Sequence, residues 1–205
     1  MSERRWLVVV ILLAALLAGV AIFWKPEWSH SGSTASPLPA GGDFTVNSAD
    51  GPVSLKDFRG RWTLLYFGYT FCPDICPTSL AATARALSQL SAEEREKVAV
   101  LFVSVDPERD TPGHLKEYAR FFDENMLGAT AAPEVLAEIA RRYGVFYARA
   151  KVETAGGGYV VDHTADTFVI DPAGRLVGKL VHGTAPAEIA ASLRQSMNSQ
   201  PRKGN

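Results

Sequence analysis

The pattern of apolar and polar positions in the middle of the chain predicts strands that alternate with helices. Residues 61–69 and 97–106 are almost continuously apolar, which is typical of strands buried on both faces of a sheet. Between them, residues 78–94 carry leucines at helical spacing and predict an amphipathic helix. Thr111 followed by Pro112 predicts the start of another helix, because threonine caps helices and proline fits their first position. This alternation indicates a sheet with crossover helices.

Apolar alternation around turn residues predicts three β-hairpins. Residues 43–55 alternate about the Asp50-Gly51 pair, a strong turn signal. Residues 146–163 look like two short strands around a glycine-rich turn, and residues 166–183 flank an Asp-Pro-Ala-Gly turn. Two further helices are expected, over residues 132–145, where Gly144 is the C-cap, and over residues 185–197.

The order of these elements predicts an α/β protein with helices on both faces of the sheet. Strands that alternate with helices and are followed by a terminal β-β-α unit have the order of the thioredoxin-like fold. The hairpin at residues 146–163 is additional to that order. The prediction is therefore a thioredoxin-like fold with a β-hairpin inserted before its last two strands.

The beginning of the chain has a different character. From Trp6 to Trp24 there is no charged or strongly polar residue. As a helix this run would span roughly 28 Å, close to the thickness of the hydrocarbon core of a bilayer. Arg4 and Arg5 precede the run, so the positive-inside rule predicts a transmembrane anchor with a cytoplasmic N-terminus. The alternative is a cleaved signal peptide, whose nearest small-residue cleavage site is at residues 33–35.

These patterns divide the chain into four parts. Residues 1–24 are predicted to be the cytoplasmic N-terminus and transmembrane anchor, and residues 25–42, rich in Ser, Pro and Gly, a flexible tether. Residues 43–197 form the predicted thioredoxin-like domain, and residues 198–205 a disordered tail. We expect a single-pass protein of the bacterial inner (cytoplasmic) membrane, with its domain facing the periplasm.

Composition narrows the classes of function. The 205 residues include 47% hydrophobic and 10% aromatic side chains, which is enough for a real core. The 21 basic and 22 acidic residues are mixed along the chain without a basic face, so we expect no nucleic-acid partner. The candidate chemistry therefore lies in a few individual side chains.

The chain has two cysteines, Cys72 and Cys76, between a predicted buried strand and a predicted helix. They are separated by three residues, whereas a thioredoxin redox pair has two. Because the dipole at a helix N-terminus favours anions, we expect both thiols to ionise more easily than a free cysteine. An i, i+4 spacing in the first helical turn would place both sulfurs on one face, and Pro73 and Pro77 fit that turn.

Three roles are open to this cysteine pair. A structural disulfide across so short a loop would contribute only about 2 kcal/mol to stability. A thiol–disulfide oxidoreductase is the second, because helical i and i+4 Cα atoms lie near the upper end of the disulfide range. The third is a metal site made of two thiolates and one or two further ligands.

A histidine close enough to the cysteines to bind the same ion would favour the metal site over the other two roles. His30 lies in the tether, His114 is expected on a helix surface, and His182 is expected to be a partly buried residue at a strand end. His163 lies just before a strand that, in a thioredoxin-like sheet, is adjacent to the cysteine turn. The fold usually has a cis-proline there, but residues 160–170 contain no proline. We therefore expect His163 to be the third ligand.

The ligand set of Cys72, Cys76 and His163 favours copper. Two soft thiolates and one imidazole suit Cu(I) in a trigonal site, or Cu(II) if one more donor joins them. A structural zinc site would need a fourth protein ligand, and the sequence offers no obvious one.

Three stretches now become recognisable: GYTFCPDICPTSL at residues 68–80, VSVDPERDTP at residues 103–112, and VDHTADTFVIDPAGRL at residues 161–176. In this order they closely resemble the Sco/SenC family of copper-delivery proteins for cytochrome c oxidase, over about residues 38–197. The resemblance implies a membrane-tethered, thioredoxin-like, copper-binding domain whose ligands match the three residues above.

The resemblance also draws attention to three aspartates. Asp74 lies inside the first motif, where it either caps the helix or has a direct role. Asp106 and Asp110 lie in the second motif, where either residue could dock a partner or tune the metal. The alternative for Asp110 is that it helps to cap the next helix.

As a function, the resemblance implies a metallochaperone. It would take copper from an upstream donor and pass it by ligand exchange to the dinuclear copper centre of an oxidase subunit, as a carrier and not an enzyme. The alternative is a thiol–disulfide oxidoreductase that reduces the cysteines of that oxidase site; a redox or copper sensor is a third class. A Cys72–Cys76 disulfide would abolish metal binding, so the redox state of the pair would control copper loading.

Overall fold

The structure, a computed structural model, describes residues 38–151 and 158–199 together with Trp6 and Leu13. The chain divides into two units after Pro37, and the strands and helices below belong to the second unit. The predicted anchor, apart from Trp6 and Leu13, lies outside the described residues, as does most of the predicted tether and tail. Within the described residues, no helix has both the length and the apolar character that a membrane crossing requires.

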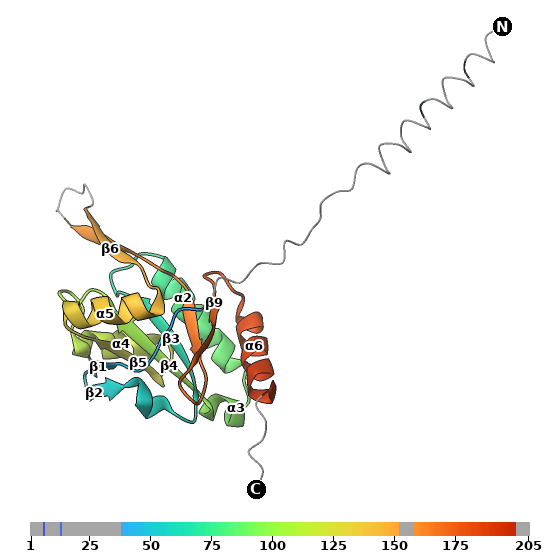
Figure 1. Cartoon of the computed structure of the whole chain (residues 1–205), viewed down its shortest axis with the longest axis horizontal. Helices are drawn as coiled ribbons and strands as arrows, with labels where there is room; N and C mark the ends of the chain where they lie inside the picture. The colour runs from blue at the N-terminus through green and yellow to red at the C-terminus, as the bar shows by residue number, and fades with distance from the viewer. Residues whose placement is uncertain (1–5, 7–12, 14–37, 152–157, 200–205) are drawn as a thin grey trace. The chain divides into compact units, whose positions relative to one another are not determined.

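Strands that are far apart in the sequence form one mixed sheet (Figure 1). They are β1 (Thr45–Ser48), β2 (Gly51–Ser54), β3 (Trp62–Gly68), β4 (Val98–Ser104), β5 (Met126–Thr130), β8 (Thr167–Ile170) and β9 (Leu176–Leu180). Their order across the sheet is β2-β1-β5-β4-β3-β8-β9. β3, β4 and β5 run parallel, and the predicted hairpins β1–β2 and β8–β9 add antiparallel strands at the two edges.

Helices connect these strands. They are the 3-10 helix η1 (Leu55–Phe58) and the α-helices α2 (Ile75–Ser88), α3 (Ala92–Glu96), α4 (Pro112–Phe122), α5 (Pro133–Tyr143) and α6 (Pro186–Ser199). The single helix predicted over residues 78–94 is two helices, because Ser91 and Glu94 form a capping box that starts a new one. Thr111 caps α4 as predicted, and α5 ends at Gly144 in a left-handed conformation with φ 63°.

The core lies on both sides of the central strands, as their apolar sequences predicted. Every residue of β3 and β4 is buried. Tyr66 of β3 faces one side, where its ring stacks on Phe102 at 6.2 Å, and Phe102 contacts Tyr118 of α4 at 5.6 Å. Phe67, the next residue, faces the opposite side and packs against Tyr143 of α5 at 5.8 Å. Helices therefore cover both faces of the sheet.

The sequence pattern gave no indication of β5. The strand contains Gly128, and glycine weakens any strand pattern. A Cβ at this position would lie 2.3 Å from the carbonyl oxygen of Leu115, so α4 packs directly against the strand backbone. Residues 126–130 form a strand because they pair with β4 and β1 and because α4 packs against them. These contacts involve distant segments, so they cannot be read from the local sequence.

The predicted inserted hairpin consists of β6 (Tyr147–Lys151) and β7 (Tyr159–His163), which form a separate two-stranded sheet that extends away from the main one (Figure 1). The two strands pair in antiparallel register, with Tyr147 opposite His163. His163 is the last residue of β7, whereas the sequence placed it in a loop. The hairpin therefore holds His163 at its base, next to the main sheet.

Candidate metal centre

The two cysteines lie where β3 is followed by a turn and then by α2. Cys72 belongs to the turn and Cys76 is the second residue of α2, because the helix begins only at Ile75. The prediction that both cysteines occupy the first turn of one helix is therefore wrong for Cys72. The predicted closeness is nevertheless present: the backbone N–H of Cys76 donates to the sulfur of Cys72 at 3.4 Å.

Cys76 is fully buried, with 0% of its surface exposed. Burial raises the pKa of the Cys76 thiol far above its ordinary value, and the backbone of Tyr69 lowers it by less. The expectation that Cys76 ionises more easily than a free cysteine is therefore wrong, because burial disfavours the charged thiolate. A bound metal ion would reverse this balance, since a coordinating thiol is deprotonated outright.

His163 completes the cluster. Its Nε2 atom lies 3.2 Å from the sulfur of Cys76. Its Nδ1–H donates to the carbonyl oxygen of Thr164 at 2.9 Å, which leaves the lone pair of the neutral ring on Nε2. Burial lowers the pKa of His163, so the neutral form is favoured further. The ring therefore presents to the sulfur the nitrogen that is free to bind a metal ion.

The candidate ligand atoms of Cys72, Cys76 and His163 all lie within 4.8 Å of one another. The structure thus brings together the three residues that the sequence singled out. Both thiols are free, and among the described residues no carboxylate joins this group. Two sulfurs and one imidazole fit a soft ion such as Cu(I), whereas a closed tetrahedral zinc site would need one more protein ligand.

The two sides of the cluster differ in exposure. Cys76 faces the core, while Cys72 is half-buried. The apolar side chains of Phe71 and Ile75, which flank Cys72, are exposed, and Phe71 has 56% of its surface accessible. Phe146, whose backbone pairs with Thr164 beside His163, is 64% exposed. Exposed apolar side chains therefore lie beside Cys72 and beside His163, and we call these three residues the apolar rim of the cluster.

Asp110 holds the cysteine turn in place. Its carboxylate accepts hydrogen bonds from the backbone N–H of Thr70 at 2.9 Å, from the Thr70 hydroxyl, and from the hydroxyl of Ser104 at 2.5 Å. It does not cap α4, because that role belongs to Thr111. Asp110 therefore ties the turn before Cys72 to the end of β4.

Asp106 acts on the hairpin that carries His163. It is fully buried, pairs with the guanidinium of Arg109 at 2.5 Å, and accepts a hydrogen bond from the hydroxyl of Tyr159 at 2.7 Å. Arg109 in turn donates to the carbonyl oxygen of Tyr159 at 3.0 Å and lies 3.8 Å above its ring. Sequence reasoning picked out Asp106 but missed Arg109 and Tyr159, although Arg109 lies within the same motif.

Two tyrosines next to the cluster were also missed. Tyr66 and Tyr69 meet the His163 ring edge-on, with centroids 6.1 Å and 5.8 Å away. The hydroxyl of Tyr69 accepts a hydrogen bond from the backbone N–H of Val161 in β7, at 3.2 Å. In the sequence these tyrosines look like ordinary residues of a buried strand, so nothing local marked them as neighbours of the histidine.

The remaining candidates lie around the cluster. Asp74 occupies the N-cap position of α2, but its side chain accepts a hydrogen bond from the Thr78 hydroxyl at 3.2 Å and not from the backbone. His114 is exposed as expected, and its Nε2 lies 3.1 Å from the Thr70 hydroxyl. His30 lies outside the described residues.

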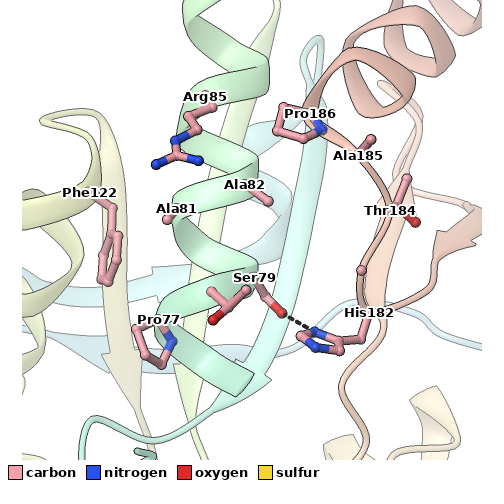
Figure 2. Close-up of a pocket in the computed structure, with 12 residues that line it drawn as sticks. Pro77, Ser79, Ala81, Ala82, Arg85, Phe122, His182, Thr184, Ala185 and Pro186 are labelled. Atoms are coloured by element: carbon pink, nitrogen blue, oxygen red, sulfur yellow. Dashed lines mark hydrogen bonds between the residues drawn. The ribbon is translucent and has the colours of Figure 1, made fainter. Parts of the chain in front are cut away.

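His182 was expected to be partly buried, and this was wrong. It follows the end of β9 and is exposed. It belongs to a loop that runs along one side of a groove over α2 (Figure 2). Its Nδ1 lies 2.9 Å from the hydroxyl of Ser79. The groove floor includes Ala81 and Ala82, with Arg85 at one end.

The comparison with known proteins gives the family. The sequence profile of the SCO1/SenC family matches residues 32–198. The chain belongs to the SCO1/SenC family. Its curated Sco relatives include the mitochondrial SCO1 homolog 2 of Arabidopsis thaliana, with 35% identity over 170 residues; the match covers 82% of this chain and 61% of that protein. The chain thus spans less than two thirds of the length of this relative.

Solved Sco structures show the same fold. Bradyrhizobium japonicum ScoI, determined with copper bound, is 39% identical, with a TM-score of 0.67 that covers 76% of this chain and 98% of that one. Yeast Sco1, also determined with copper bound, is 28% identical, with a TM-score of 0.72 over 80% of this chain and 92% of that one. The predicted thioredoxin-like α/β fold is thereby confirmed as that of Sco proteins.

Proposed function

We propose that this protein is a copper metallochaperone that holds copper through Cys72, Cys76 and His163 and delivers it to the dinuclear copper centre of cytochrome c oxidase. The observation that carries the proposal is that the three ligand atoms lie within 4.8 Å of one another although they come from separate elements. The copper-bound Sco relatives of Bradyrhizobium and yeast support it.

The arrangement has the properties that copper transfer needs. Both thiols give up their protons when they bind the ion, and His163 binds through the Nε2 that its tautomer leaves free. Cys72 lies on the open side, so it is the ligand that a cysteine of the partner exchanges first, while buried Cys76 keeps hold of the ion until the exchange is complete. The exposed rim of Phe71, Ile75 and Phe146 provides a surface for that partner.

Substitution of the histidine tests the metallochaperone proposal against the reductase alternative. We expect His163→Ala to lose most of its copper affinity and to support little oxidase assembly in cells, while the Cys72–Cys76 pair keeps its ability to be oxidised and reduced. His182→Ala is the matched control, because His182 is exposed and bonds to Ser79 instead of the cluster. If the purified, reduced wild-type protein bound no copper, the proposal would be refuted.

The alternative function rests on the closeness of the two thiols. Both are free, and their sulfurs belong to the same tight cluster, so a disulfide between them needs only a local rearrangement. As a reductase the protein would reduce a disulfide of the oxidase site, and Cys72 and Cys76 would become a disulfide in exchange. In that case His163→Ala would leave oxidase assembly largely intact.

We further propose that the domain is tethered to the bacterial inner membrane, faces the periplasm and receives copper from an upstream donor there. The support comes from the sequence: an uncharged apolar run from Trp6 to Trp24 with Arg4 and Arg5 before it. Fusion of a reporter that is active only in the periplasm to the C-terminus tests the orientation. Activity of a reporter that works only in the cytoplasm would contradict it.

A further inference from the structure

The hydroxyl of Tyr66 is a buried polar group that finds no hydrogen-bond partner within residues 38–151 and 158–199. Only 1% of the Tyr66 surface is exposed, so solvent does not satisfy it. A buried donor without a partner costs free energy, and a native structure that keeps one usually has a reason. One such reason is an acceptor that becomes available when a ligand binds.

The Tyr66 hydroxyl lies beside the sulfur of Cys76. A Cβ built on Gly68 would be 2.6 Å from that sulfur and 3.0 Å from Cε1 of Tyr66, so both atoms border the same small space on one side of β3. The thiols of Cys76 and Cys72 are close enough to the phenol to raise its pKa, after burial itself, and the His163 ring lies on the same side with its centroid 6.1 Å away. The hydroxyl of Ser79, which is also nearby, already bonds to His182 at 2.9 Å.

The state of Cys76 decides whether this sulfur can accept the hydrogen bond. A neutral thiol is a weak acceptor, whereas a metal-bound thiolate carries negative charge and is a strong one. We propose that Tyr66 is a positioning residue of the metal centre, whose O–H donates to the Cys76 sulfur when that sulfur binds copper. This inference rests on the proposed function, because it needs Cys76 as a ligand.

Such a bond would affect both the affinity and the electronic structure of the site. It would orient the sulfur and withdraw charge from it, as hydrogen bonds around ligating cysteines do in other copper sites. Removal of an outer partner of this kind typically lowers metal affinity by 10–100-fold. Because the bond is weak to the neutral thiol and strong to the metal-bound thiolate, the hydroxyl should add little or nothing to stability without copper and should add stability with it.

Tyr66→Phe in the full-length, reduced protein tests this inference. We expect this variant to bind copper about tenfold more weakly than wild type. The Cu(II)–thiolate absorption band should move to longer wavelength, because the sulfur becomes a better electron donor. The change in melting temperature relative to wild type should depend on copper. Without copper, the variant should melt at or above the wild-type temperature. With copper bound, it should melt below the temperature of copper-loaded wild type. A role in packing alone would lower both temperatures.

Tyr143→Phe is the control. The Tyr143 ring packs against Phe67 on the opposite face of the sheet from Tyr66, and its hydroxyl donates to the carbonyl oxygen of Gly42 at 2.8 Å, away from the cysteines. We expect this variant to keep the wild-type affinity and absorption band. An unchanged band and affinity in Tyr66→Phe, or equal shifts in both variants, would overturn the role of Tyr66 while leaving the proposed function intact. A wild-type protein that bound no copper would overturn both.

Discussion

Gly68 shows how the metal centre depends on empty space as much as on ligands. It is the last residue of β3, and the sulfur of Cys76 occupies the volume that a side chain would fill. A Cβ there would be 2.6 Å from that sulfur, closer than Cβ contacts come in proteins, and 3.1 Å from a ring carbon of Phe102, which is tighter than most such contacts. The buried position of Cys76 therefore requires glycine at residue 68.

Gly68→Ala is consequently expected to displace the sulfur and to weaken copper binding by about tenfold or more, comparable to the loss of an outer partner of a metal ligand. Gly178→Ala is the control, since a Cβ at that strand position meets nothing within 4 Å. Titration of each reduced protein with copper against a competing chelator gives the affinities. Equal affinities in the two variants would show that the sulfur adapts to the added methyl group.

At the scale of elements, the decisive contact is the one that holds the β6–β7 hairpin against the main sheet. The hairpin has its own two-stranded ladder, so the main sheet's hydrogen bonds do not fix its position. Two residues of β7 anchor it. The hydroxyl of Tyr159 donates a hydrogen bond to Asp106, and its ring lies under the guanidinium of Arg109. The backbone N–H of Val161 donates to the hydroxyl of Tyr69. These contacts determine where His163 stands relative to the cysteines.

Tyr159→Phe removes a hydrogen bond to a buried carboxylate, which is worth about 1.5–3 kcal/mol. We expect faster amide hydrogen exchange in β7 and weaker copper binding, with the main sheet still folded. Tyr147→Phe is the matched control, because this half-buried tyrosine lies in β6 of the same hairpin and its hydroxyl has no hydrogen bond among the described contacts. Equal exchange rates in β7 for both variants would contradict the anchoring role of Tyr159.

The β8–β9 turn provides a test of pH dependence. Asp171 accepts hydrogen bonds from the backbone N–H and the guanidinium of Arg175, both at 2.8 Å. Burial raises the pKa of Asp171, but the bonds and charge of Arg175 outweigh it, so the pKa lies below its ordinary value. The contribution of ionised Asp171 to the stability of the fold is therefore fully present above the unfolded-state pKa of about 3.9, and it is lost as the pH falls through the lower folded-state pKa.

Asp171→Asn, which does not titrate, should accordingly be less stable than wild type at pH 7, and the difference should shrink as the pH falls below about 4. Free energies of unfolding from urea titrations at pH 7 and at acid pH measure this difference. A difference that stays constant over the whole range would mean that the charge of Asp171 does not contribute.

At the scale of the whole molecule, stability comes from the central parallel strands. Leu101 is fully buried in β4, between Leu65 of β3 and Leu127 of β5. Leu101→Ala should lower the free energy of unfolding by about 2–5 kcal/mol, because it removes buried methyl groups and leaves a cavity. Val177→Ala, at an exposed position of β9, should lower it by about 0.5 kcal/mol or less. Below its melting temperature, the Leu101 variant should still bind copper, since no ligand has changed.

Much of this fold could be predicted because its signals are local. Continuous apolar runs marked β3 and β4, turn residues marked the hairpins, and the Thr111 cap marked α4. The missed strand is a case in which distant contacts decided the outcome. β5 is a strand because β4, β1 and α4 surround it, despite the glycine that allows α4 to approach. The break between α2 and α3 was missed although the capping box at Ser91 was readable in the sequence.

The sequence by itself determined which side chains could bind a soft metal ion, namely two thiols and one of four histidines, together with the strand and turn that carry them. Only the tertiary structure decided that Cys76 is buried, which raises its pKa, and that Asp106, Asp110 and the nearby tyrosines position the three proposed ligands. The physical reason is that residue type and periodicity are local, whereas burial and the 3.2 Å approach of Cys76 to His163 depend on the packing of segments that are distant in sequence.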